Sequence, residues 1–113
     1  MTDLIDWVSE VVADTPHPRS PRVRREALHV DDGFVYACDG HRLRVVFTGH
    51  KLPKGSLALA DFRLWEALGV SPKIDRETFD YRAMIDVAKS KTFNAELKVH
   101  DNGGIEVVYH NKG

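Results

Sequence analysis

Histidine is the residue type in this chain best suited to metal binding or acid–base chemistry, because its imidazole titrates near neutral pH and coordinates metal ions. The sequence places its histidines on separate predicted elements: His17, His29, His41, His50, His100 and His110. No two of them have the His-x-x-x-His spacing, and a single cysteine excludes a Cys-x-x-Cys pair. The sequence therefore predicts no metal centre.

Nucleophilic catalysis has little support either. Cys38 falls in a predicted strand, where it is better explained as a small buried apolar residue than as a nucleophile. Asp39 lies near His41, but no serine stands in a recognisable nucleophile elbow. Gly103-Gly104 belongs to a predicted hairpin, so it is not a phosphate-binding loop. We expect a non-enzymatic protein without a cofactor.

The charges near the N-terminus are segregated by sign. Every charged residue before position 17 is a carboxylate: Asp3, Asp6, Glu10 and Asp14. Residues 17–25 then carry only basic charges: Arg19, Arg22, Arg24 and Arg25. Such a segment is either a solvated, proline-interrupted loop or a contact for nucleic-acid phosphates, which basic segments bind with release of counterions.

A tight turn is predicted at Asp39-Gly40, because glycine takes positive φ without steric cost. His41 and Arg42 follow the turn, so we expect their hydrogen-bond donors at the rim of a sheet beside the apolar Leu43. That combination suits a peptide whose backbone carbonyls and hydrophobic anchors both need partners. The alternative is a hairpin tip with solvated side chains.

The segment around this turn, residues 34–43, reads Phe-Val-Tyr-Ala-Cys-Asp-Gly-His-Arg-Leu. It resembles a signature of bacterial DNA sliding clamps, the beta subunit of the replicative polymerase, whose middle domain carries a similar Ala-Thr-Asp-Gly-His-Arg-Leu segment. The neighbouring elements agree in order: a helix with an aliphatic stripe, a basic stretch and a strand precede it. Leu52-Pro53, a short strand and a second helix follow. The resemblance covers residues 3–70.

The resemblance implies a role in DNA replication or repair. Sliding clamps build each domain from two helix-plus-meander units, line a DNA-filled hole with helices, and capture short peptides in an outer groove. By resemblance, a partner-binding rim is formed by Cys38, Gly40, His41, Arg42 and Leu43, with cysteine in place of the usual threonine. Because the first predicted helix carries only carboxylates, we expect that this chain does not encircle DNA.

Hydrophobic spacing predicts the elements that position these residues. A helix over residues 3–13, capped by Thr2 or Asp3, precedes strands over 24–30, 34–38, 42–48 and 56–59. A second helix over 62–68 is expected to begin at the cap Asp61 and to end at Gly69. Its inward face is predicted to comprise Leu64, Trp65 and Leu68. A weaker helix over 81–89 precedes a hairpin of strands 93–100 and 105–110 around the turn 101–104.

These elements predict an α+β fold in which two helices pack on an antiparallel sheet built from a repeated helix–meander unit. We expect residues 1–113 to form a single clamp-like domain whose terminal strands are missing. Residues 79–82, Phe-Asp-Tyr-Arg, also resemble the segment that closes the clamp's middle domain. In that alternative, residues 83–113 begin a second module, which could not bury its own apolar face.

Composition is consistent with an ordinary globular domain, with 42% hydrophobic residues and a formal net charge of −1. The charge disfavours a dedicated polyanion binder. One cysteine, an acidic N-terminus and the lack of a long apolar run predict a cytoplasmic protein. Unpaired sheet edges lead us to expect a homodimer by edge pairing, or a docked partner.

The sequence thus predicts a clamp-like binding module, encoded by a phage or other mobile element. Its expected partner is a replication or repair protein, or a true sliding clamp. The alternative is a nucleic-acid-binding regulator that uses the arginines of residues 19–25.

Overall fold

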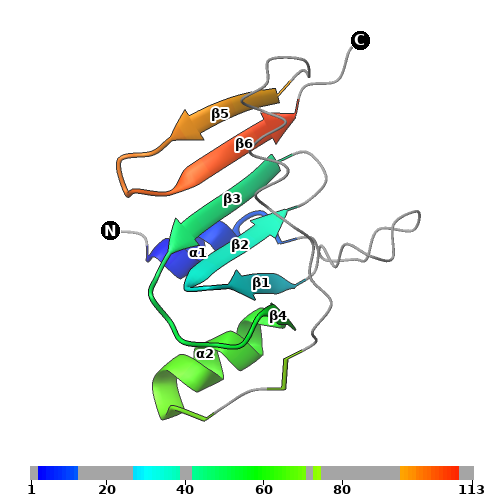
Figure 1. Cartoon of the computed structure of the whole chain (residues 1–113), viewed down its shortest axis with the longest axis vertical. Helices are drawn as coiled ribbons and strands as arrows, with labels where there is room; N and C mark the ends of the chain where they lie inside the picture. Colours follow the sequence, from blue (N-terminus) through cyan, green and yellow to red (C-terminus); the bar gives the residue numbers. More distant parts are fainter. Residues whose placement is uncertain (1–2, 13–26, 39–41, 71–72, 75–94, 110–113) are drawn as a thin grey trace, which may run out of the picture.

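In the described part of the chain, one helix is followed by four strands and a second helix by two strands, an order typical of an α+β protein. The structure is a computed structural model that describes residues 3–12, 27–38, 42–70, 73–74 and 95–109. Its elements are α1 (Leu4–Ser9), β1 (Leu28–Asp31), β2 (Phe34–Cys38), β3 (Arg42–Phe47), β4 (Gly55–Leu57), α2 (Leu59–Leu68), β5 (Ala95–Val99) and β6 (Ile105–Tyr109) (Figure 1). The predicted helix over 81–89, the segment 79–82 and the first residues of the predicted strand 24–30 lie outside the described residues.

All described strands belong to one antiparallel sheet of six strands in the order β4-β1-β2-β3-β6-β5. Strands β1, β2 and β3 form the predicted meander, and β4 returns to pair with β1. The predicted C-terminal hairpin is confirmed, and it joins the sheet through β6, which pairs with β3. The sheet therefore unites the beginning and the end of the chain.

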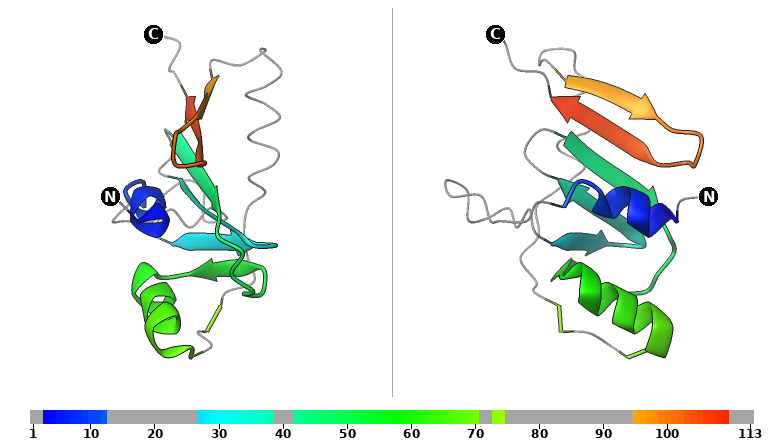
Figure 2. Two further views of the ribbon diagram at one scale, coloured as in Figure 1. Left: turned by 90° about the vertical axis from the view of Figure 1, so that its left-hand side faces the viewer. Right: turned by 180° about the vertical axis from the view of Figure 1, so that it is seen from behind.

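Both helices cover the same face of this sheet (Figure 2). Ile5, Val8 and Val11 from the N-terminal segment and Phe62 from α2 share one buried cluster with the inward residues of β1, β2 and β4. A second cluster contains Tyr36, Cys38, Leu43, Val45 and Val107. These residues alternate along the strands with those of the first cluster, so they belong to the opposite face. Central strands such as β2 are therefore buried on both faces.

Asp3 is the N-cap of α1, and it is one of the two residues that the sequence predicted for this position. Its carboxylate accepts hydrogen bonds from the backbone N–H groups of Ile5 (2.7 Å) and Asp6 (3.4 Å). The helix is shorter than predicted: after Ser9 the backbone bonds of Val11 and Val12 reach back three residues instead of four. The last turn is thus tightened, as is common at helix ends, yet Val11 stays buried.

Helix α2 corrects two predictions. Its N-cap is Ala58, so Asp61 lies within the first turn and does not cap the helix. Leu64 and Leu68, predicted to face inward, are 49% and 66% exposed, whereas Phe62 is completely buried. With 100° of rotation per residue, Phe62 and Trp65 share the face that packs on the core, and Leu64 points well away from it. Leu68 lies at the margin of this face, in the last residue of the helix. Gly69 ends the helix in the left-handed conformation, as predicted.

Among the described residues, no helix has the length and apolarity needed to cross a membrane.

Candidate functional site

The predicted partner-binding rim lies where β2 ends and β3 begins, in the middle of the sheet. Cys38 pairs with Leu43, and both side chains are buried in the second cluster, at 3% and 0% exposure. Arg42 is half-buried and pairs with Val108 of β6. Gly40 and His41 lie outside the described residues. Of the rim residues that the structure describes, Arg42 is half-buried, whereas Cys38 and Leu43 are buried.

The alternative nucleic-acid contact cannot be placed in the fold, because Arg19, Arg22, Arg24 and Arg25 all lie outside the described residues.

A charged network that the sequence did not reveal joins α1 to the C-terminal hairpin. Arg44 donates from Nε to the Glu106 carboxylate at 2.7 Å, and from Nη1 to the Trp7 carbonyl at 2.8 Å and to Glu10 at 3.0 Å. The Arg44 guanidinium also lies over the Trp7 ring, 4.6 Å from its centroid. These contacts fix the N-terminal helix against β3.

Glu106 is the acceptor at the centre of this network. Its side chain is only 7% exposed and also contacts His100 Nε2 at 3.1 Å. Burial alone would raise the pKa of Glu106, but the hydrogen bonds and positive charge of Arg44, together with His100, hold this pKa below its usual range. Glu106 is therefore a stable carboxylate whose role is to neutralise Arg44.

The alternation of side chains along β3 is the sequence feature that could have indicated this network. Arg44 falls between Leu43 and Val45, so its side chain must point to the face that α1 covers. A charged residue on a covered face needs a partner, but the identity of that partner depends on the pairing of β3 with β6. Sequence spacing alone does not give this pairing.

A second ionic contact joins the two helices. Arg63 of α2 contacts Asp3 (3.5 Å), Asp6 and Glu66 (2.7 Å). Desolvation would raise the pKa of Asp3, but the backbone N–H groups of Ile5 and Asp6 and the Arg63 guanidinium lower it. The basic side chain of α2 is thus neutralised by carboxylates, so the described helices offer no basic surface.

A buried Ser–His pair lies on adjacent strands. His29 Nδ1 is 2.7 Å from Ser56 Oγ, and the His29 ring stacks on Tyr36 with centroids 5.0 Å apart. His29 and Ser56 are paired directly across β1 and β4, and their exposures are 0% and 1%. A substrate cannot reach a pair that is this deeply buried. We interpret it as a structural hydrogen bond that holds β4 to the sheet.

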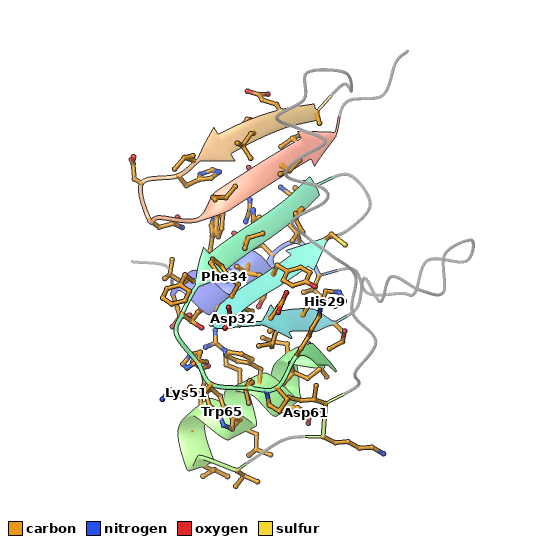
Figure 3. All side chains as sticks on the ribbon, in the orientation of Figure 1. His29, Asp32, Phe34, Lys51, Asp61 and Trp65 are labelled. Carbon is orange, nitrogen blue, oxygen red and sulfur yellow. The ribbon has the colours of Figure 1, made fainter. Side chains whose placement is uncertain are left out.

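An open pocket of about 440 Å³ lies at the opposite end of β2 and β3 from the predicted rim. Its walls come from the β1–β2 turn and the loop after β3: Asp32, Gly33, Phe47, Gly49, His50, Lys51, Leu52 and Pro53. Figure 3 places Asp32, Phe34 and Lys51 on the side of the molecule where these segments meet. The pocket mixes one carboxylate and one ammonium group with exposed aromatic surface, since Phe47 is 62% exposed.

Among the described residues, no three His, Cys, Asp or Glu side chains are grouped so that they could hold a metal ion. Comparison with models of protein families, with curated proteins and with solved structures finds no match for this chain.

Proposed function

We propose that this protein is a non-enzymatic, clamp-like binding module that acts on the DNA replication or repair machinery, encoded by a phage or other mobile element. In this proposal it contacts a replication or repair protein, or a true sliding clamp, through the rim between β2 and β3.

The observation that carries the proposal is the position of the clamp-like segment 34–43. Its first five residues form β2 and its last two begin β3, in a meander at the centre of an antiparallel sheet. Both helices cover one face of that sheet, which is consistent with the layering expected for a clamp domain (Figure 2). The rim lies at the ends of the central strands β2 and β3, and the half-buried Arg42 gives it a charged residue for a peptide contact.

The helices support a protein partner over encircled DNA. Asp3, Asp6 and Glu10 give the α1 segment a negative surface. Glu10 already contacts Arg44, and Asp3 and Asp6 already contact Arg63, so both arginines are neutralised. Phosphates approaching this face would meet carboxylates instead of unpaired cations, and the interaction would be repulsive at low salt. We therefore propose that the module does not thread DNA.

The proposal is tested by titrating the isotope-labelled protein with a clamp-binding peptide and, separately, with duplex DNA at low and moderate salt. We expect the peptide to shift the amide resonances of residues 38–45 in a saturable manner. Shifts confined to residues 17–25 on addition of DNA, with a steep dependence on salt, would favour the nucleic-acid-binding alternative and contradict the proposal.

A further inference from the structure

Strand β5 is the outermost strand at one end of the sheet that the described residues form. It pairs with β6 on one side, and no other described strand pairs with it. Glu96, Lys98 and Val99 are exposed, Val99 to 74%. The strand at the other end of the sheet, β4, has only three residues, and all are buried. An exposed edge of this kind is a template for pairing with another chain.

The hairpin geometry determines which backbone groups of β5 point away from the sheet. The N–H of His100 donates to the Gly104 carbonyl at 2.9 Å, and Val99 lies opposite Ile105. Residues of an antiparallel strand bond alternately to one side and to the other. Lys98 and Glu96 therefore bond toward β6. The N–H and C=O groups of Ala95, Leu97 and Val99 point outward.

We propose that β5 pairs antiparallel with β5 of a second copy of this chain, about a two-fold axis at Leu97. In this register Leu97 pairs with the partner subunit's Leu97, and Val99 with the partner subunit's Ala95. All of these residues carry outward backbone groups, so the ladder is complete. Glu96 then lies opposite the partner subunit's Lys98 at a non-hydrogen-bonded position, where facing side chains are closest.

The charges select this register against its neighbours. Sliding the second strand by two residues, the smallest shift that preserves the hydrogen-bond pattern, places Glu96 opposite Glu96 or Lys98 opposite Lys98. Both arrangements are repulsive. A slide by one residue places backbone N–H and C=O groups that point toward the second strand opposite groups that point back toward β6. The hydrogen bonds between the two strands are then lost. Charged residues on an edge usually prevent pairing, but here their opposite signs make the edge complementary to itself.

The apolar side chains are consistent with the same arrangement. Ala95 and Leu97 pack on the second cluster, and Val99 lies on the same side of β5. Pairing across the two-fold axis covers the exposed Val99 with the partner subunit's Ala95 and joins the two sheets into one. This interface lies on β5, whereas the proposed peptide contact lies on β2 and β3, so either proposal can fail without the other.

The inference is tested by sedimentation of the full chain over a wide range of concentrations. We expect the mass to rise from that of one chain to that of two. Glu96→Lys and Lys98→Glu, each alone, place like charges across the interface and should weaken self-association about tenfold. An equimolar mixture of the two variants restores opposite charges, and so does one chain carrying both changes; both should associate as the wild type does.

Controls separate the interface from the fold. Lys98 lies opposite Glu106 on β6, and Glu96 takes part in an interaction of its own chain, so either change can lower the stability of the chain itself. Thermal unfolding of every variant measures this effect. Lys54→Glu makes the same charge change at an exposed site distant from β5 and should leave association unchanged. The inference would be overturned by any of three results. The wild type has the mass of one chain at all concentrations, no single variant weakens the dimer, or the mixture of the two variants associates no more strongly than each variant alone.

Discussion

The Arg44 guanidinium bonds to acceptors from both α1 and β6, and its side chain is only 11% exposed. Removing its buried carboxylate partner, Glu106, leaves the largely buried Arg44 charge with only the more exposed carboxylate of Glu10. We expect Glu106→Gln to lower the free energy of unfolding by about 3 kcal/mol at neutral pH. Glu66→Gln, which removes a more exposed partner of Arg63, should cost about 0.5 kcal/mol in the same urea-unfolding experiment.

The same pair predicts a dependence of stability on pH. The pKa of Glu106 is lower in the folded protein than its reference value of 4.5, so the folded state favours the carboxylate. Its contribution to stability is therefore present above pH 4.5 and is lost as the pH falls through the folded pKa. We expect the stability difference between wild type and Glu106→Gln to shrink below pH 4.5. A difference that stays constant from neutral to acidic pH would contradict this assignment.

Gly104 lies against the Trp7 ring, where α1 meets the C-terminal hairpin, and this contact leaves no room for a side chain. A Cβ atom at this position would overlap the Trp7 ring, and the Trp7 ring also contacts His100 with centroids 5.0 Å apart. We expect Gly104→Ala to cost about 1–3 kcal/mol, because the ring must move away from its packing site. Combining it with Trp7→Phe should cost less than the sum of the single changes in a double-mutant cycle. Strict additivity would show that the two residues do not compete for space.

At the scale of elements, α2 is attached to the core by one side. Phe62 is completely buried, whereas Leu68 is 66% exposed. We expect Phe62→Ala to cost about 3–5 kcal/mol and Leu68→Gln to change stability by less than about 0.5 kcal/mol. Chemical unfolding of both variants checks this. A large loss for Leu68→Gln would mean that the outer face of the helix is buried by a contact in solution.

The periodicity of single elements was sufficient to predict much of the fold. The aliphatic stripe located α1, hydrophobic spacing located the strands of the meander, and the turn 101–104 located the last hairpin. In α2, however, seven of ten residues are apolar, so hydrophobic spacing alone did not decide which face is buried. The contacts of Phe62 and Trp65 with the His50 ring and with the core identify the buried face.

Contacts between elements were less accessible to prediction. The Arg44–Glu106 pair joins residues 62 positions apart, and it exists because β6 inserts beside β3. The burial of Cys38 and Leu43 follows likewise from their shared face in the sheet. The resemblance of residues 34–43 indicated the rim, but the motif alone does not tell which of its side chains are accessible.

At the scale of the whole molecule, the described surface offers three different kinds of contact. The helix face is acidic and internally neutralised, the β5 edge is the proposed contact for a second copy, and the β2–β3 rim with Arg42 is the proposed contact for a peptide. A protein with this distribution can bind a peptide at the rim while it dimerises at the edge. We expect the rim, and not the β5 edge, to determine which peptide the protein binds.

The rim is therefore the place to test the proposed function, by measuring the affinity of a fluorescent clamp-binding peptide for wild type, Arg42→Ala and the exposed control Lys54→Ala. Arg42→Ala should weaken binding by at least about tenfold, as is usual for a central arginine contact, while Lys54→Ala should bind as the wild type does. Equal affinity of all three proteins, or no binding by the wild type, would contradict a clamp-like contact through this rim.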